Sequence, residues 1–442
     1  MLGARVIPAG HGHPADLDEL STPHTPPMRV LIVAAGSMGD VAPYTGLAAR
    51  LLGVGHDVAI ATYACFADLV TNCGARFRPL PGDPRTQQNS AENQRWQRGG
   101  GGALNGFRLV RLVAAHTREM NGAVLAAARA GVDVLLLSTP ALFSGYPVAD
   151  GLGIPSIGVF LTPMHPTGEF PPAIGLPSLG RWGNRAVHGL LRDVGFIPFA
   201  RATRQLRAEL GLPPLSAAGM FREQDRRRWP VCYGFSPSVL ARPGDWRDGL
   251  DVTGYFWPLR REGWQPPPEL TRFLESGPAP VFVGFGSLAT GDSDRLSHIV
   301  RSALREVGAR GVIQAGWADL DVSDDNVITI GEAPHDWLFP RMAATVHHCG
   351  AGTTAAGLAA GVPAVAVPLA GDQPFWAKRL FELGATPAVL PHRKLTVDAL
   401  AARIRAVLAD PCYAACAAEL SGRIGEEDGA GKVIAALDRL VG

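Results

Sequence analysis

The segment that most limits how this chain can fold is residues 343–373, which read AATVHHCGAGTTAAGLAAGVPAVAVPLAGDQ. Its first five residues predict a short buried strand. A glycine-rich turn then begins a helix of small residues, and a second apolar strand, Pro363–Pro368, leads to Asp372 and Gln373. A strand, a turn and a helix N-terminus in this order form an anion site, because free backbone N–H groups and the positive end of the helix dipole face the ligand.

The turn itself supplies donors suited to phosphate oxygens. Gly350 and Gly352 let the backbone approach closely, and His348, Thr353 and Thr354 add side-chain donors. The spacing differs from GxxxxGK[ST] and the turn has no lysine, which argues against a P-loop nucleotide hydrolase. The alternative is an ordinary strand–helix–strand unit in which His348 is only a hydrogen-bonded loop residue.

The composition describes a two-domain globular protein without a strong charge preference. The 442 residues exceed what one compact core holds, and 41 basic against 40 acidic residues give no net attraction to nucleic acid. No apolar run reaches the 18 residues of a spanning helix. The six cysteines show no framework of spacings, and Cys412 and Cys416 have no second ligand pair for zinc, so we expect reduced thiols and a cytoplasmic protein.

The strand–helix alternation predicts an α/β fold with two doubly wound, Rossmann-like domains facing each other across a cleft. Residues 1–27 predict a disordered tail, 28–240 the first domain, 241–262 a linker, and 263–418 the second domain, with a C-terminal helix from 419 that packs back on the first. Strands are expected at 29–35, 57–62, 75–80, 133–138, 153–159, 280–286, 311–315 and 326–330, and helices at 41–53, 65–73, 181–209, 294–306, 396–409 and 419–440.

Two stretches of the first domain predict irregular structure. Residues 87–105 are polar and glycine-rich, and fit either a loop over a site or a disordered insert. Residues 161–176 are proline-rich and carry apolar side chains.

The turn after the first strand, GSMGDV, lacks the third glycine of a dinucleotide fingerprint and carries Asp40 in its place. A carboxylate there would repel a diphosphate, which argues against a nicotinamide cofactor and for another role of Asp40. Capping the helix at 41–53 is the structural alternative.

Residues 347–354, HHCGAGTT, followed by GLAAGVPAVAVPLAGDQ, resemble the donor-binding signature of the nucleotide-sugar glycosyltransferases of family 1, which have the GT-B fold. The segments GSMGDVAPYTGLAARLLGVGHDVAIAT, FRPLPGDPR, PTGEFP, YGFSPSVLARPGDW and VTGYFWP resemble the branch that contains sterol 3-beta-glucosyltransferases and actinobacterial natural-product glycosyltransferases. The resemblance covers almost the whole chain from Met28.

The resemblance implies an inverting, metal-independent hexosyltransferase. It would move a sugar from UDP-glucose, or a related UDP- or dTDP-sugar, to an acceptor hydroxyl, and it needs no cofactor besides this co-substrate. Asp40 matches the residue taken as general base in this branch. Other branches use a histidine in the same turn, where this chain has Met38 and Gly39, so Asp40 is the titratable candidate.

The resemblance also implies a donor site. His348, Ser287 and the backbone N–H groups of residues 350–354 would hold the diphosphate, and Asp372 and Gln373 the sugar hydroxyls. Trp317, Ala333 and His335 would border the nucleobase. The structural alternatives are a helix cap for Ser287, a polar turn for Asp372 and Gln373, and a core position for Trp317.

On the acceptor side, Met38 stands where many relatives have arginine, and Cys349 stands where bacterial relatives have glycine. Apolar residues would form a wall for a sterol, polyketide or aromatic acceptor: Met38, Phe160, Met164, His165, Phe170 and Ile174. A hydrophobic hinge explains the same residues equally well.

Three alternatives to the UDP-glucose enzyme stay open: a dTDP-deoxysugar-dependent antibiotic glycosyltransferase, a sugar-nucleotide epimerase or hydrolase of the same fold, and a non-catalytic relative. Asp40, His348 and the Asp372–Gln373 pair together disfavour the last. We expect a monomer or weak homodimer. A membrane sterol as acceptor would require contact with a bilayer, and no amphipathic basic helix is evident in the sequence to make it.

Overall fold

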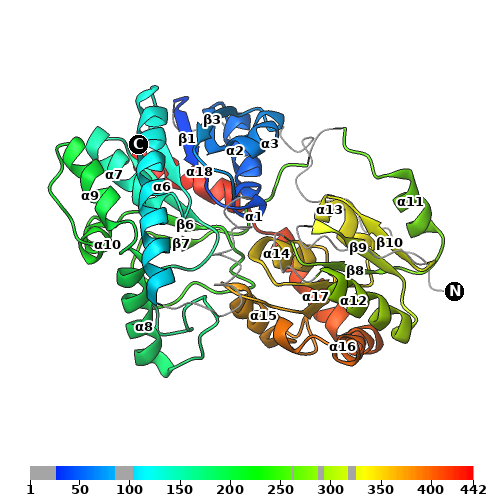
Figure 1. Cartoon of the computed structure of the whole chain (residues 1–442). Coiled ribbons are helices and arrows are strands. Elements are labelled where there is room, and N and C mark those ends of the chain that lie inside the picture. The colour runs from blue at the N-terminus through cyan, green and yellow to red at the C-terminus, as the bar shows by residue number, and fades with distance from the viewer. Residues whose placement is uncertain (1–25, 85–102, 261–262, 287–292, 317–324, 442) are drawn as a thin grey trace.

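The computed structural model describes residues 26–84, 103–260, 263–286, 293–316 and 325–441. At residues 103–115 and 217 only the backbone is described. The chain forms two α/β units that lie side by side (Figure 1). The predicted tail lies outside these residues except for its last two. Ser287, Trp317 and most of the predicted loop at 87–105 also lie outside them.

The first unit is built on a seven-stranded sheet in the order β3-β2-β1-β4-β5-β6-β7, with every pairing parallel. Runs such as RVLIV and VLLL suit it, because a parallel sheet is buried on both faces. The strands are β1 Arg29–Val33, β2 Asp57–Tyr63, β3 Arg76–Leu80, β4 Val134–Leu137, β5 Ser156–Phe160, β6 Val231–Tyr233 and β7 Leu250–Val252.

The helices of the first unit differ from the prediction in five places. The expected helix at 41–53 begins earlier, as a short turn joined to a second helix that has Pro43 at its first position. The expected helix at 181–209 is two helices. Three helices were missed: the 27-residue helix α6, α7 and α10. The helices are α1 Met38–Val41, α2 Pro43–Gly53, η2 Ala64–Phe66, α3 Ala67–Asn72, α6 Ala103–Arg129, α7 Leu142–Leu152, α8 Gly180–Gly195, α9 Ala200–Glu209 and α10 Ala217–Arg226. Residues 161–176 contain no helix or strand, as predicted.

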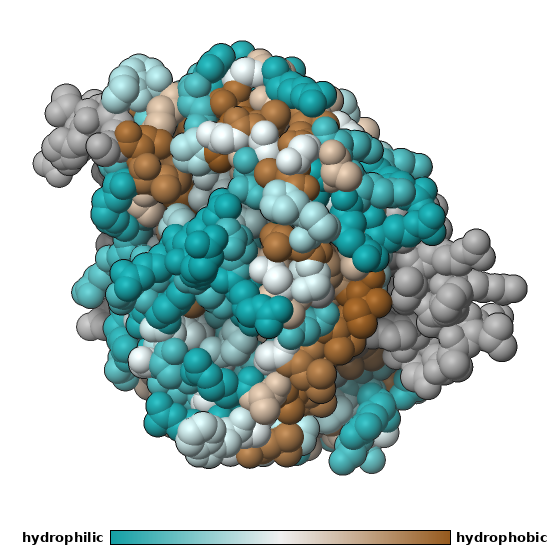
Figure 2. All heavy atoms as spheres, turned by 90° about the vertical axis from the view of Figure 1, so that its left-hand side faces the viewer, coloured by the Kyte–Doolittle hydropathy of each residue, from teal (hydrophilic) through white to brown (hydrophobic). Residues whose placement is uncertain are grey.

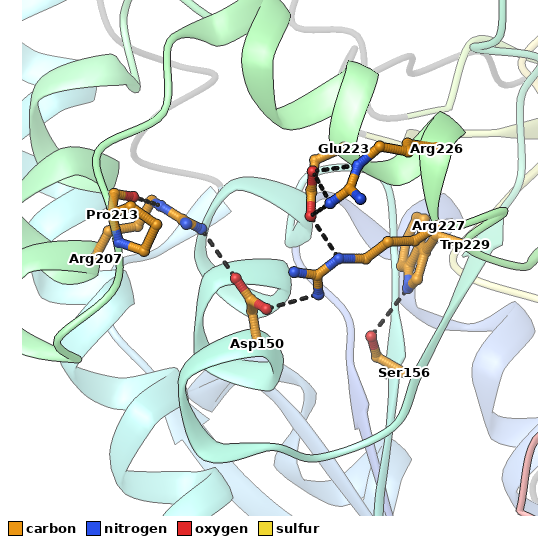
Figure 3. Close-up of polar contacts among 8 residues, drawn as sticks. All are labelled: Asp150, Ser156, Arg207, Pro213, Glu223, Arg226, Arg227 and Trp229. Atoms are coloured by element: carbon orange, nitrogen blue, oxygen red, sulfur yellow. Dashed lines mark hydrogen bonds and ion pairs between the residues drawn. The ribbon is translucent and has the colours of Figure 1, made fainter.

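A partly buried ion network connects three of these helices to one another (Figure 3). Asp150 on α7 accepts from Arg207 of α9 at 3.2 Å and from Arg227, just after α10, at 2.8 Å. Arg227 also donates to Glu223 of α10 at 2.6 Å. Arg207 is almost fully buried, so its charge depends on Asp150 for compensation.

The second unit carries a five-stranded parallel sheet in the order β10-β9-β8-β11-β12. Its strands are β8 Val281–Gly284, β9 Gly311–Gln314, β10 Val327–Ile330, β11 Ala344–His347 and β12 Ala364–Ala366. The helices are α11 Pro268–Glu275, α12 Ser293–Val307, α13 His335–Leu338, η4 Phe339–Arg341, α14 Ala351–Ala359, α15 Gln373–Glu382, η5 His392–Lys394, α16 Val397–Ala409, α17 Pro411–Gly425 and α18 Gly429–Val441.

The C-terminal end crosses back to the first unit. The expected single helix from 419 is the end of α17 followed by α18, and α18 packs against α2 and β6 (Figure 1). At the break between them, Asp428 pairs with Arg50 at 2.8 Å, and Glu427 accepts from the Ser236 hydroxyl at 2.6 Å.

The expected linker, 241–262, contains β7, so the first sheet continues past residue 240. The domain limits themselves stay a prediction. The two units also touch directly, because Phe170 meets Phe375 at 5.6 Å between ring centres and Phe235 meets Trp376 at 6.0 Å. None of the helices described here is long and apolar enough to cross a bilayer.

Candidate active site

Each sheet has a switch point, where neighbouring strands are connected in opposite directions, and in open α/β folds ligands bind at the carboxyl ends of the strands there. In the first sheet this point lies between β1 and β4, and in the second between β8 and β11. The segments that follow β1, β8 and β11 are Gly36–Asp40, Phe285–Gly286 and His348–Gly350. The residues predicted from the sequence therefore stand where this fold places its ligands.

Asp40 closes the turn after β1. Its Oδ2 atom accepts from the Ser37 N–H at 2.8 Å and from the Ser37 hydroxyl at 2.9 Å, which completes a capping box for α1. A Cβ on Gly36 would lie 2.4 Å from Oδ2, and Gly36 has φ of 130°, so glycine is required here. The alternative that Asp40 caps the helix at 41–53 is wrong: Ala42 stands at the N-terminus of α2 without a side-chain cap, and Asp40 uses one carboxylate oxygen in the capping box that begins at Ser37.

Burial raises the pKa of the Asp40 carboxyl above its usual value, and the hydrogen bonds from Ser37 oppose that shift. A raised pKa makes the carboxylate a stronger proton acceptor once it is ionised. Within the described part of the chain, Oδ1 has no hydrogen-bond partner. Asp40 is thus held by one oxygen and can receive a proton on the other.

The glycine turn of the second unit holds His348 in a fitted space. A Cβ on Gly286 would lie 2.6 Å from Cε1 of the imidazole, and a Cβ on Gly350 would lie 2.6 Å from Nε2. Gly350 is the N-cap of α14, as predicted. Among the described residues, the buried Nδ1 atom of His348 and the Thr354 hydroxyl have no hydrogen-bond partner. Unpartnered polar atoms at a helix N-terminus are the features expected of an anion-binding site.

Burial lowers the pKa of His348 to about 4, against a hydrogen bond to Gly284 that raises it. The imidazole is therefore neutral at neutral pH and would act on a diphosphate as a hydrogen-bond donor, not as a cation. Cys349, next in the chain, has φ of 63° and no exposed surface. A left-handed backbone favours glycine, which explains why the bacterial relatives have glycine at this position. A cysteine in this conformation stores strain at the site.

Asp372 and Gln373 lie at the start of α15. Asp372 Oδ2 accepts from the Trp376 indole at 2.9 Å, and Gln373 Oε1 accepts from the backbone N–H groups of Leu369 and Ala370 at 2.9 and 3.2 Å. The side-chain oxygen of Gln373 therefore shapes the turn, and only its amide NH₂ is available to a ligand. The other carboxylate oxygen of Asp372, Oδ1, is likewise available to a ligand.

The two predicted carboxylates, Asp40 and Asp372, lie within electrostatic range of each other. Burial raises the pKa of Asp372 to about 6, the Trp376 hydrogen bond opposes this, and the charge of Asp40 raises it further. Such a charge effect requires proximity, because opposing or like charges act strongly only over short distances in a protein. The tertiary structure thus brings Asp40 of the first unit within electrostatic range of Asp372 of the second.

On the nucleobase side, His335 stacks on Phe339 at 4.3 Å and burial lowers its pKa to about 4. Its ring is thus part of a packed aromatic pair, while Ala333 beside it is half-buried. Ser287 and Trp317 lie outside the described residues, so their predicted roles stay predictions.

Two of the predicted acceptor residues are core residues instead. Phe160 is 1% exposed in the middle of the first sheet and packs on Trp229 and Tyr233. His165 is 7% exposed, its Nδ1 lies 2.5 Å from the Tyr233 hydroxyl, and burial lowers its pKa to about 3. Neither offers surface to an acceptor, because both fill the space between β5, β6 and the 161–176 segment.

The other predicted acceptor residues retain accessible surface. Met38, Met164 and Phe170 are half-buried, and Ile174 is exposed. The sequence did not predict that the segment at 161–176 contacts the second unit, where the predicted donor-binding residues lie. Phe170 packs on Phe375, and a Cβ on Gly175 would lie 3.0 Å from the Pro374 ring. The segment therefore borders the start of α15, next to Asp372 and Gln373.

Comparison with known proteins agrees with this arrangement. A family model described as "Erythromycin biosynthesis protein CIII-like, C-terminal domain" matches residues 310–437. A sterol 3-beta-glucosyltransferase of Arabidopsis thaliana is 33% identical over 423 residues, which cover 94% of this chain and 68% of the plant protein. A sterol 3-beta-glucosyltransferase of Candida albicans is 33% identical over 393 residues, but the match spans only 25% of that longer protein.

Solved structures confirm the predicted fold. The glycosyltransferase of kitacinnamycin superposes with a TM-score of 0.68 at 19% identity and covers 95% of this chain and all of its own. The glycosyltransferase VinC, solved in complex with dTDP, gives 0.63 at 21% identity and covers 93% of this chain and 99% of its own. At these identities the likeness establishes the arrangement of two parallel sheets.

Proposed function

Because this chain belongs to the GT-B glycosyltransferases of family 1 that include the sterol 3-beta-glucosyltransferases, we propose that it transfers glucose from UDP-glucose to a hydroxyl of a lipophilic acceptor. Transfer would invert the anomeric centre and require no metal. The observation that carries the proposal is the placement of Asp40 after β1 and of His348 and the α14 N-terminus after β11, each beside the switch point of its sheet.

In this mechanism the acceptor hydroxyl donates its proton to Oδ1 of Asp40 while its oxygen attacks the anomeric carbon. The bond from that carbon to the diphosphate oxygen breaks on the opposite face, and the diphosphate leaves with the electron pair. The N–H groups at the start of α14, with His348 and Thr354, would receive the charge that develops on the leaving group.

Asp372 and the Gln373 amide would hold the sugar hydroxyls and so orient the anomeric carbon toward Asp40. The half-buried apolar side chains of Met38, Met164 and Phe170 favour a lipophilic acceptor, which agrees with the sterol acceptors that the relatives' names specify. The second candidate is transfer from a dTDP-sugar. The dTDP bound to the structural neighbour VinC favours it.

The test is release of nucleotide from UDP-glucose and from dTDP-glucose by the purified protein, with and without sterols, polyketides and aromatic alcohols. We expect release that depends on an acceptor. The matched variant, Asp40→Asn, should keep donor affinity and lose about 10²-fold or more of the turnover, because it retains the cap acceptor but cannot take a proton.

Three results would contradict this assignment. Full turnover by Asp40→Asn would remove Asp40 as the base. Release that is independent of every acceptor would favour a sugar-nucleotide hydrolase of the same fold, and tight UDP binding without any release would favour a non-catalytic relative.

A further inference from the structure

A band of exposed apolar side chains covers one face of the first unit. Eleven large hydrophobic residues in the described chain are strongly exposed, and seven of them fall between 174 and 197: Ile174, Leu176, Leu179, Trp182, Leu190, Val194 and Ile197. Figure 2 shows this side of the molecule, with a hydrophobic band running obliquely across its lower part, where Figure 1 places α8. We name these seven residues the α8 face.

The α8 face follows from helical spacing. Trp182, Leu190 and Val194 are separated by multiples of four residues, so they line one side of α8, while Asn184 and His188 on the opposite side are buried. Trp182 is 88% exposed, so its indole contributes almost nothing to packing within the first unit. Large apolar side chains that gather on a surface in this way indicate an interaction site. The preceding loop continues the band through Leu176 and Leu179.

This region is also strongly basic. Residues 180–209 contain six arginines and two acidic residues, in a chain whose net charge is +1. Arg185 and Arg192 are neutralised by Asp245 and Asp225. The exposed guanidinium groups of Arg181, Arg201 and Arg204, in contrast, form no ion pair within the described residues. An apolar stripe accompanied by uncompensated arginines complements an anionic bilayer surface.

A small apolar pocket lies in the same region. It encloses about 170 Å³ and is lined by Pro172, Leu176, Pro177, Leu179, Asn184 and Val187. Two of its lining residues, Leu176 and Leu179, belong to the α8 face. The segment that forms the cavity also touches α15 beside Asp372, through the contact between Gly175 and Pro374.

We propose that the α8 face docks on an anionic lipid bilayer, with α8 lying in the plane of the interface. A lipophilic acceptor would then leave the bilayer through the loop at 172–179 and reach Asp40 without crossing water; this last step rests on the proposed function. The expectation that no amphipathic basic helix is present is wrong for α8, which carries exposed apolar residues on one side and contains Arg181, Arg185 and Arg192.

The experiment is flotation of the full-length protein with phosphatidylcholine vesicles, with and without phosphatidylglycerol. We expect binding that increases with phosphatidylglycerol. The variant Trp182→Ser/Leu190→Ser/Val194→Ser should bind at least about tenfold more weakly, because three apolar side chains no longer enter the interface. The matched control, Phe381→Ser/Leu408→Ser, removes exposed apolar residues from the second unit and should bind like the wild type.

The charge contribution is tested separately with Arg181→Gln/Arg201→Gln/Arg204→Gln. This variant should lose the preference for phosphatidylglycerol and keep the weaker binding to phosphatidylcholine alone. No flotation of the wild type with either vesicle would overturn the proposal. A second result would also overturn it. If light scattering shows a wild-type dimer that the triple serine variant cannot form, and neither protein binds vesicles, the α8 face contacts a second copy of the chain instead of a bilayer.

Catalysis is measured on the same variants so that the two proposals can fail independently. With an acceptor dissolved in detergent, the triple serine variant should turn over like the wild type, and with an acceptor embedded in phosphatidylglycerol vesicles it should be at least about tenfold slower. Vesicle binding without turnover of any acceptor would contradict the proposed function alone. Equal turnover of wild type and variant on embedded acceptor would overturn the docking.

Discussion

At the scale of single residues, the site contains carboxylates that the fold destabilises. Asp372 is buried, near the charge of Asp40, and the Trp376 indole donates to it. Its raised pKa of about 6 means that the folded protein binds this proton more tightly than the unfolded chain does. Strained groups of this kind persist at functional sites, because a bound ligand can supply the missing partners.

We predict that Asp372→Asn stabilises the protein at neutral pH. As the pH rises from about 4 to about 6, the wild type loses stability because the folded state must release a proton that it binds more tightly than the unfolded state does. Asparagine cannot ionise and still accepts from Trp376, so it should gain roughly 1–3 kcal/mol at pH 8. The measurement is the thermal midpoint of both proteins from pH 4 to 8.

The two midpoints should converge at the acid end, where Asp372 is protonated in both the folded and the unfolded state. The rate of sugar transfer by the same preparation of Asp372→Asn should fall. A variant that is more stable but transfers sugar more slowly would show that this carboxylate serves function and not folding. A variant that is less stable than the wild type at pH 8 would contradict the prediction.

At the scale of elements, the ion network in Figure 3 decides how α7, α9 and α10 hold together. We predict that Asp150→Ala costs about 3–5 kcal/mol, because it leaves the buried guanidinium of Arg207 without its carboxylate. The matched control is Arg226→Ala, which removes a 72% exposed partner of Glu223 and should cost less than about 1 kcal/mol.

Urea unfolding of the three proteins, followed by circular dichroism, measures the difference. Because α10 packs against α8, the first unfolding step of Asp150→Ala should also expose the α8 face, which a hydrophobic dye would report. Equal midpoints for Asp150→Ala and Arg226→Ala would show that the network adds no stability.

At the scale of the whole molecule, the two units share contacts that include Phe170 on Phe375 and α18 against α2. The proposed diphosphate site lies on one unit and Asp40 on the other. We predict that UDP brings the units closer together, because the ligand supplies contacts to both only in a closed arrangement. Small-angle scattering should show a smaller radius of gyration with UDP.

Uridine, which lacks the diphosphate, is the control ligand and should leave the radius unchanged. Asp40→Asn should compact with UDP as the wild type does, since the substitution leaves the donor side intact. An unchanged radius at saturating UDP would contradict closure and indicate that the cleft is preformed.

Much of the fold was predictable because its signals are local. The strands at 29–33 and 344–347 are apolar runs followed by glycine turns, and a parallel sheet buried on both faces requires such runs. The helix α6 was missed because four glycines at 99–102 precede it and conceal its start. The break between α8 and α9 was missed because Phe196 and Ile197 continue the apolar pattern of the helix before them.

Local order along the chain was enough to locate the turn at Asp40, the glycine turn at His348–Thr354 and the pair Asp372–Gln373, since each depends on adjacent residues. Which apolar residues of the acceptor side face outward depends instead on how the elements pack. Phe160 and His165 are core whereas Trp182 is exposed, because sheet packing and not residue type assigns those positions. The approach of Asp40 to Asp372 was likewise decided by packing, because no local interaction links residues so distant in the chain.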